Sequence, residues 1–251
     1  MNLSATSFDL GNAQACAAAS ARAYREATVS CPSTDTHALI VEQPDCVIIA
    51  FRGSSSIRNW ITDAEFERNL WKHQLAAEVH DGFLLAFDSI IDLLCVQLKT
   101  IGLAGRPLFF TGHSLGGALA VLAALDFKDL FKIHSVITFG QPRVGDSAFK
   151  QLYDAALGDR TYRLVYKEDI VPRVPHLPAW HDPYRHVGTE VFISSVQDGT
   201  LWFDPPSWRL LMSDIWGIYR AWCVSKFAGA LDPFMDHRVE NYVNALVNLK
   251  P

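Results

Sequence analysis

The segment Gly-His-Ser-Leu-Gly at 112–116 constrains this chain more than any other. An apolar stretch at 107–111 precedes it and an Ala- and Leu-rich stretch at 115–127 follows, which predicts a strand, a sharp turn and a helix. Side chains at the two flanking positions of such a turn would collide with the strand and the helix, which favours glycine there. The hydroxyl of Ser114 would project above a sheet edge, beside the free N–H groups of a helix N-terminus. This setting is typical of a nucleophilic serine.

Strands and helices alternate through most of the chain. Expected strands cover 38–42, 46–51, 107–111, 135–139, 161–166 and 190–194, and expected helices cover 12–24, 82–98, 115–127, 146–156 and 238–249. This alternation predicts the α/β class, with a mostly parallel central sheet flanked by helices. A further amphipathic helix is expected at 207–223, either packed on the core or forming a wall of an acyl-binding cleft.

Length and composition exclude several classes of protein. The 251 residues suit one domain, 1–251, and the net charge of −5 without a block of Lys or Arg argues against a nucleic-acid partner. The longest apolar run, 118–125, is far shorter than the ~20 residues of a membrane-spanning helix. The first 15 residues lack Lys and Arg and include Asp9, unlike a signal peptide. We therefore expect a cytoplasmic protein or the mature form of an exported one.

Cysteine usage points away from metal chemistry. The five cysteines are odd in number and form no C-x-x-C pair, which makes a zinc site improbable. Buried free thiols are the simpler expectation, and one or two disulfides stay open if the protein is exported.

A second segment, Phe-Arg-Gly-Ser-Ser-Ser at 51–56, follows an expected strand. An oxyanion hole needs N–H donors from two chain segments that converge on one oxygen. One donor would be Leu115, the residue after the nucleophile, and Ser54 is well placed to be the other. An ordinary Gly-Ser turn is the alternative for this segment.

The residues directly after this segment predict a lid. Apolar side chains recur there at helical spacing, so a short amphipathic turn could cover the nucleophile and swing away at an apolar surface. A fixed surface helix is the alternative. The expected lid residues are Ile57, Arg58, Asn59, Trp60 and Ile61.

Five segments together carry a resemblance to a known family. They are FRGSSSIRNW at 51–60, VHDGF at 79–83, TGHSLGGA at 111–118, TFGQPRVG at 138–145 and DIVPRVP at 169–175. With them the chain resembles the class 3 (fungal-type) lipases, which include feruloyl esterases and plant acylhydrolases. The resemblance runs from about residue 20 to 195 and resumes near Asp236. It departs over 188–236, which is longer and more hydrophobic than the family's usual connection, so substrate preference does not carry over.

The resemblance implies an α/β-hydrolase-like fold and a set of site residues. Ser114 would be the nucleophile, Asp169 the triad acid and His237 the base, with Ser54 and Leu115 as oxyanion donors. The order Ser, Asp, His along the chain agrees with this fold. Asp169 follows the expected strand 161–166, and His237 lies in a loop before the last helix. His113 is expected to be structural and to point away from the site. The competing acids and bases are Asp182, Asp236, His176, His181 and His186.

These residues predict ester hydrolysis through an acyl-enzyme. The resemblance implies that the esters are acylglycerols and that the enzyme is a triacylglycerol lipase, gated by its lid at the lipid interface. The expected partners are an ester substrate and, transiently, a lipid–water interface, with no metal, organic cofactor, nucleic acid or protein partner. A soluble-ester enzyme such as a feruloyl esterase is the first alternative. A catalytically silent lipase-like binding module is the second, and phospholipid or galactolipid substrates stay open.

Overall fold

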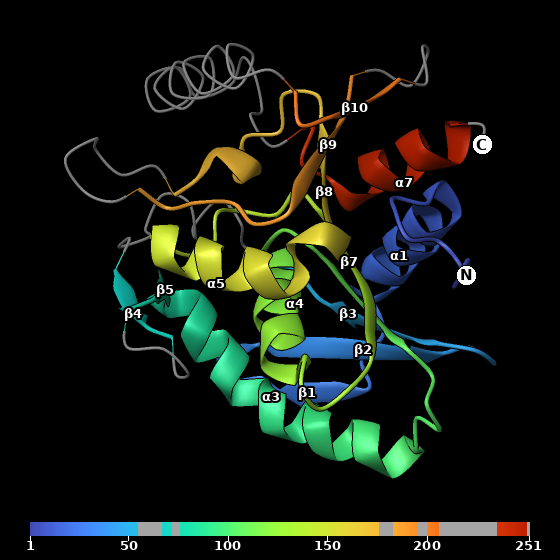
Figure 1. Ribbon diagram of the computed structural model, residues 1–251, viewed down its shortest axis with the longest axis vertical. Helices are drawn as coiled ribbons and strands as arrows, with labels where there is room; N and C mark the ends of the chain where they lie inside the picture. The colour runs from blue at the N-terminus through green and yellow to red at the C-terminus, as the bar shows by residue number, and fades with distance from the viewer. Residues whose placement is uncertain (55–66, 72–75, 176–182, 195–199, 206–234, 250–251) are drawn as a thin grey trace.

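The computed structural model describes residues 1–54, 67–71, 76–175, 183–194, 200–205 and 235–249. Its centre is an eight-stranded sheet with the order β1-β2-β3-β6-β7-β8-β9-β10 (Figure 1). These strands are β1 (Val29–Cys31), β2 (Thr36–Glu42), β3 (Val47–Phe51), β6 (Leu108–His113), β7 (Ile133–Phe139), β8 (Thr161–Tyr166), β9 (Thr189–Ile193) and β10 (Leu201–Phe203). The strands from β3 to β9 run parallel, and antiparallel pairs form the two edges. The mostly parallel sheet predicted from the alternating pattern is confirmed.

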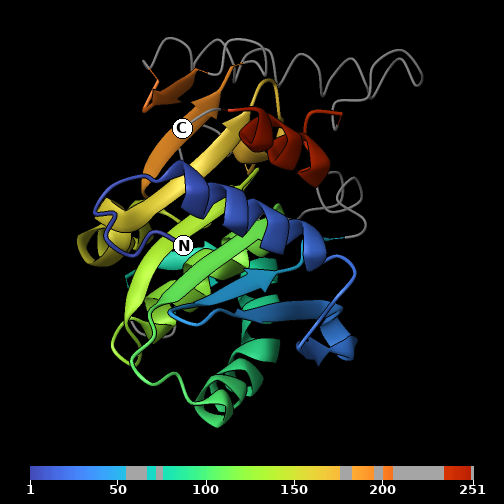
Figure 2. The ribbon, with the colours of Figure 1, turned by 90° about the vertical axis from the view of Figure 1, so that its right-hand side faces the viewer.

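Helices cover both faces of this sheet. On one face lie α3 (Asp81–Ile101), α4 (Leu115–Phe127) and α5 (Ser147–Leu157), and on the other lie α1 (Leu10–Arg22) and α7 (Val239–Asn248) (Figures 1 and 2). Successive strand residues point to opposite faces, so Ile49 and Phe110 join the core under α3 and α4, whereas Ile48 and Phe109 join the core under α1. The central strands are therefore apolar throughout, as expected for a parallel sheet buried on both sides.

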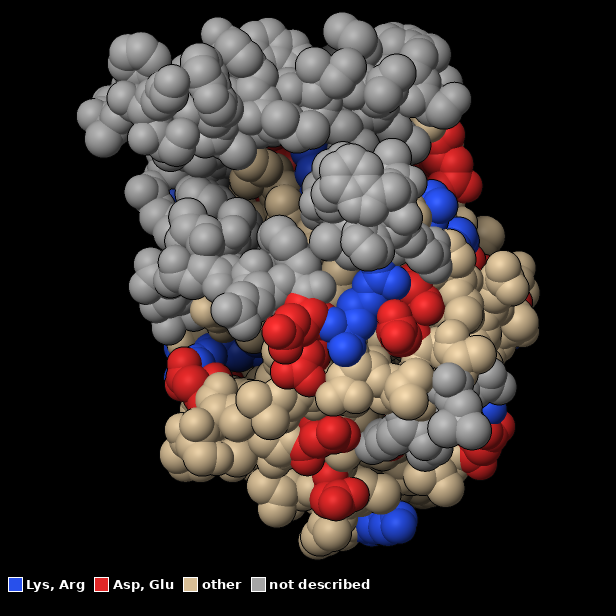
Figure 3. Space-filling model, turned by 90° about the vertical axis from the view of Figure 1, so that its left-hand side faces the viewer, with Lys and Arg blue, Asp and Glu red and all other residues tan. Residues whose placement is uncertain are grey.

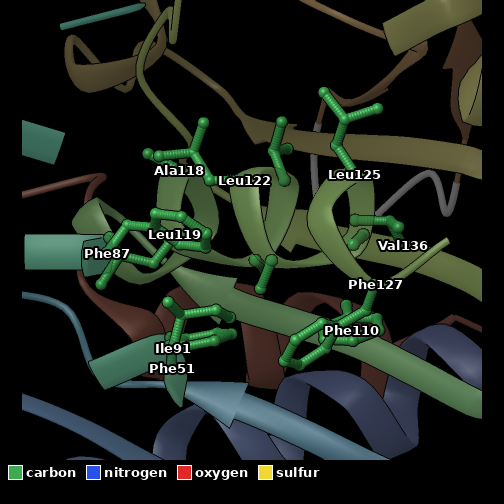
Figure 4. Packing of buried hydrophobic residues seen from close by; sticks show 14 of the residues in the cluster. Phe51, Phe87, Ile91, Phe110, Ala118, Leu119, Leu122, Leu125, Phe127 and Val136 are labelled. Carbon is green, nitrogen blue, oxygen red and sulfur yellow. The ribbon is translucent and has the colours of Figure 1, made fainter. Parts of the chain in front are cut away.

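The core beneath α4 is built from large side chains. Figure 4 shows Leu119 and Leu122 of α4 among Phe87 of α3 and Phe110 of β6, and all four side chains are fully buried. Helix α4 has 11 buried positions out of 13. A helix that is apolar all round belongs inside a protein, which explains why this one carries no charged residue before Asp126.

Most expected elements are found with nearly the expected bounds. The helix expected at 115–127 and the strand expected at 161–166 have the same bounds in the structure, and the ends of the other expected elements differ by at most three residues. The strands that sequence patterns missed have three residues each: β1, β10 and the two-stranded ribbon of β4 (Arg68–Leu70) and β5 (Glu78–His80). A three-residue strand is too short to show an alternating pattern. The helix expected at 207–223 lies outside the described residues.

Three short 3₁₀ helices complete the described elements. They are η1 (Pro32–Thr34), η2 (Gly158–Arg160) and η3 (Val171–Arg173). In the described part of the chain, no helix is long and apolar enough to cross a membrane. Basic and acidic side chains lie next to one another on the face shown in Figure 3.

The cysteines in the described part of the chain test the expectation of buried free thiols. All four are free: Cys16 and Cys46 are buried, as expected, whereas Cys31 and Cys95 are partly exposed.

The parallel strands bring distant residues to one edge of the sheet. Because β6, β7 and β8 run in the same direction, their carboxyl ends lie together. Ser114 follows β6, Gly140 follows β7, and Asp169 comes three residues after β8. Crevices at the carboxyl ends of the strands are where open α/β sheets place their ligands.

Candidate active site

Ser114 occupies a strained turn between β6 and α4. Its φ of +60° and ψ of −129° lie in a region that residues with a side chain rarely adopt. The N–H of Ser114 donates to the carbonyl of Phe139 at 2.9 Å, which ties the turn to the end of β7. The hydroxyl is buried and has no hydrogen-bond partner among the described residues. A buried hydroxyl without a partner costs free energy, which is typical of a group kept for chemistry.

The two glycines that flank this turn have no room for a side chain. A Cβ on Gly112 would lie 2.2 Å from the carbonyl oxygen of Gly116. A Cβ on Gly116 would lie 2.1 Å from the carbonyl oxygen of Phe51, at the end of β3. Backbone atoms cannot yield as a flexible side chain would, so the steric reason expected for both glycines is confirmed.

Asp169 and His237 form a buried pair beside the turn. The imidazole Nδ1 of His237 donates to both carboxylate oxygens of Asp169, at 2.8 and 3.0 Å. The N–H of Val171 donates to the same carboxylate at 2.9 Å, and the hydroxyl of Tyr242 donates to it at 2.5 Å. Both members of the pair are buried, Asp169 completely.

The neighbours of Asp169 lower its pKa in spite of its burial. Burial by itself would raise the pKa of this carboxyl. The His237 imidazole and the hydrogen bonds from His237, Tyr242 and the Val171 N–H outweigh burial, and the pKa of Asp169 is lowered from its ordinary value of 3.8. The group is therefore a carboxylate at neutral pH.

Gly140 joins the pair to the serine turn. A Cβ on Gly140 would lie 2.8 Å from Oδ2 of Asp169 and 2.9 Å from Cε1 of His237, so both side chains pack on the backbone of Gly140. The preceding residue, Phe139, accepts the hydrogen bond from Ser114. Ser114 and His237 thus lie against consecutive residues at the end of β7. With Nδ1 engaged by Asp169, Nε2 of His237 is buried and without a partner among the described residues, as the hydroxyl of Ser114 is.

The two segments expected to form an oxyanion hole also meet here. The contact between Gly116 and Phe51 places the end of β3 against the start of α4. Leu115 is the first residue of α4, where a helix N–H has no partner within the helix. Ser54 follows β3 by three residues. The roles of Ser54 and Leu115 as donors stay predictions, and the expected lid residues, 57–61, lie outside the described residues.

The competing residues lie elsewhere or outside the described residues. Nε2 of His186 donates to the carbonyl of Pro172 at 2.6 Å, and burial holds the pKa of His186 well below 6.5. Asp236 is half-buried and is not the partner of the His237 ring, which Asp169 holds. His176, His181 and Asp182 lie outside the described residues. Among the described residues, no three His, Cys, Asp or Glu side chains gather as a metal site would require.

Sequence patterns missed the partners of the Asp169–His237 pair. Tyr242 lies five residues after His237, in the part of the chain where the resemblance resumes, but no role was expected for it. His113 was expected to point away, and this is wrong: its ring centroid lies 4.4 Å from that of His237, and its Nε2 contacts the His237 carbonyl at 2.5 Å. Consecutive residues of β6 and its turn take opposite directions, which placed His113 away from Ser114. The His237 ring and carbonyl both contact His113.

Comparison with known proteins agrees with this geometry. The family model described as "Lipase (class 3)" matches residues 48–178. A lipase of Rhizomucor miehei is 37% identical over 175 residues, covering 64% of this chain and 46% of that protein. A secreted mono- and diacylglycerol lipase of Fusarium solani is 33% identical over 150 residues, covering 59% of this chain and 44% of that protein. This chain therefore spans less than half the length of these two relatives.

A solved structure shares the fold. It is described as a serine protease triad forming the catalytic centre of a triacylglycerol lipase. It superposes with a TM-score of 0.66 and 29% identity, covering 80% of this chain and 86% of that one.

Proposed function

This chain belongs to the class 3 lipase family, and from that premise we propose that it hydrolyses the ester bonds of acylglycerols as a triacylglycerol lipase. The observation that carries the proposal is the buried Asp169–His237 pair, which lies against the end of β7 beside the strained turn of Ser114. A binding module would not need to keep a buried hydroxyl and a buried imidazole nitrogen without partners. The expected single domain, 1–251, stays a prediction.

The proposed reaction begins with Ser114. Its Oγ attacks the ester carbonyl carbon while Nε2 of His237 takes the hydroxyl proton. The carboxylate of Asp169 holds Nδ1–H, so that Nε2 is the free nitrogen, and it stabilises the imidazolium that forms. The tetrahedral oxyanion then accepts hydrogen bonds from the backbone N–H groups of Ser54 and Leu115.

Collapse of this intermediate breaks the bond to the alcohol. Nε2 of His237 returns its proton to the leaving alcohol oxygen, and the acyl group stays on Ser114. Water then attacks the acyl-enzyme, with His237 as the base, and releases the carboxylic acid. Each step needs only this chain's own groups and one water molecule, so no cofactor is part of the proposal.

The lipid–water interface enters the proposal through the lid. The spacing of Ile57, Trp60 and Ile61 supports a lid over residues 57–61 that exposes an apolar face when it opens. Mono- and diacylglycerol lipases among the relatives make partial glycerides the first further substrates to test.

The first experiment measures hydrolysis of tributyrin with Ser114→Ala in parallel. We expect Ser114→Ala to lose about 10³-fold or more of the rate, because it removes the attacking oxygen. Ser135→Ala is the matched control: Ser135 is a buried serine on β7, and its variant should keep wild-type activity. Hydrolysis that survives in Ser114→Ala would refute the mechanism.

The same assay separates the substrate classes. The rate is followed through the solubility limit of tributyrin. A steep rise once droplets form supports a lidded lipase. A rate that saturates below the limit contradicts lid gating and favours an enzyme of soluble esters. Dibutyrin and a short-chain phosphatidylcholine, assayed beside tributyrin, test the preference for the number of acyl groups and for the head group.

A further inference from the structure

We propose that Tyr24 is a positioning residue, whose hydroxyl acts through His113 to hold His237 and lies against the loop that leads to Ser54. Tyr24 lies two residues after the end of α1, and its hydroxyl bonds to His113. This inference rests on the proposed function, since it concerns the same reaction. It assigns a task to the segment that follows α1, which supplies none of the residues expected to react.

The hydroxyl of Tyr24 lies between two parts of the site. It is 2.8 Å from Nδ1 of His113, the residue before the nucleophile. A Cβ on Gly53 would lie 2.1 Å from the same hydroxyl oxygen and 2.7 Å from the carbonyl oxygen of His113. Gly53 precedes Ser54, so the Tyr24 hydroxyl contacts both the oxyanion loop and the serine turn.

The hydrogen bonds of His113 set the direction of this link. The carbonyl of His237 can only accept, so Nε2 of His113 carries the proton and donates to it. Nδ1 of a neutral imidazole then has only a lone pair, so it accepts from the hydroxyl of Tyr24. Burial and the neighbouring His237 lower the pKa of His113 to about 3, which keeps the ring neutral. Tyr24 is largely buried and its pKa is raised, so its hydroxyl keeps its proton.

The chain of bonds runs from Tyr24 through His113 to the backbone of His237. It joins the end of α1, the serine turn and the loop before α7, which are 89 and 124 residues apart along the sequence. Without the hydroxyl, Nδ1 of His113 would be buried without a partner, and the other tautomer could no longer donate to the His237 carbonyl. His237, which lies in a loop, would then lose the hydrogen bond from His113 to its carbonyl. A misplacement of 1 Å can cost about 100-fold in rate.

The test compares Tyr24→Phe with the wild type on p-nitrophenyl butyrate below its solubility limit. We expect kcat to fall about tenfold or more while KM stays within about twofold, because substrate contacts are unchanged. Binding of butylboronic acid, which forms a tetrahedral adduct on serine, should weaken by a similar factor. Tyr153→Phe is the matched control: its hydroxyl is fully buried and lies 2.9 Å from Thr161, far from the site. It should lower the melting temperature and leave kcat unchanged.

Three outcomes would overturn the inference, and a fourth concerns the proposed function. A kcat of Tyr24→Phe within twofold of the wild type, or an equal loss in Tyr153→Phe, would remove the positioning role. In ¹⁵N-labelled wild-type protein, the ring signals of His113 should show the Nε2–H tautomer, and the Nδ1–H tautomer would also refute it. Ser114→Ala is assayed alongside, because activity in that variant would defeat the proposed function itself.

Discussion

Ser114 concentrates two unfavourable features in one residue. Its φ is +60°, and its hydroxyl is buried without a partner among the described residues. The neighbouring glycines and the hydrogen bond from its N–H to Phe139 hold the turn in place. Strain of this kind is found where function requires it and the surrounding structure enforces it.

The positive φ of Ser114 predicts that Ser114→Gly stabilises the protein while abolishing activity. Glycine adopts the positive φ without steric cost, so we expect the free energy of unfolding to rise by about 1–3 kcal/mol. Urea denaturation monitored by tryptophan fluorescence measures it. Ser114→Ala is the comparison, because it removes the hydroxyl and keeps the Cβ. If the free energy of unfolding rises equally in Ser114→Gly and Ser114→Ala, the backbone of Ser114 is not strained.

At the scale of elements, α4 links the site to the core. The helix begins at Leu115, directly after the candidate nucleophile, and its side chains are buried against α3 and the sheet. Apolar packing on all sides fixes the direction in which its first N–H groups point. The geometry of the site therefore depends on a helix that supplies none of the expected site residues beyond Leu115, the expected oxyanion donor.

Truncation within this helix tests its contribution to stability. Leu122 is fully buried in α4, so Leu122→Ala should lower the free energy of unfolding by about 2–5 kcal/mol. Leu130, which follows α4 and is 60% exposed, provides the control, and Leu130→Ala should change it by less than about 0.5 kcal/mol. Thermal and urea unfolding give both values. Similar losses in the two variants would mean that α4 does not form the packed core.

At the scale of the whole molecule, buried neutral histidines make stability depend on pH. Burial lowers the pKa of His80 to about 4 and that of His113 to about 3. Burial also holds the pKa of His186 well below its ordinary 6.5. Between those lowered values and 6.5, the unfolded chain binds protons that the folded chain does not. Stability is therefore complete above pH 6.5 and falls as the pH drops below it.

The expected slope is about 1.4 kcal/mol per pH unit for each such histidine, or about 4 kcal/mol per unit for three. The lowered pKa of Asp169 adds nothing here, because its contribution is lost only below its ordinary 3.8. Urea unfolding at pH 7.5, 6 and 5 measures the slope, and His80→Asn should reduce it by about a third. A free energy of unfolding that stays level from pH 6 to pH 5 would contradict the neutral state of these rings.

Local patterns were sufficient for the longer helices and strands and for the turn at Ser114. Apolar runs and helical spacing predicted β8 and α4 with their observed bounds, because the pattern of apolar residues within each segment indicates its secondary structure. The glycines around Ser114 predicted a tight turn, because a side chain on Gly112 would clash with the backbone of Gly116, only four residues away. The resemblance then singled out Asp169 and His237, whose side chains the structure brings together.

The contacts that hold these residues were decided only by the tertiary fold. Tyr242 reaches Asp169 across 73 residues, and His113 reaches the backbone of His237 across 124. No local period records such a hydrogen bond, because it depends on how the sheet, α1 and α7 pack against one another. A chain segment specifies its own turns and faces. Which group forms a hydrogen bond with a buried hydroxyl or imidazole is decided only when these segments pack against one another.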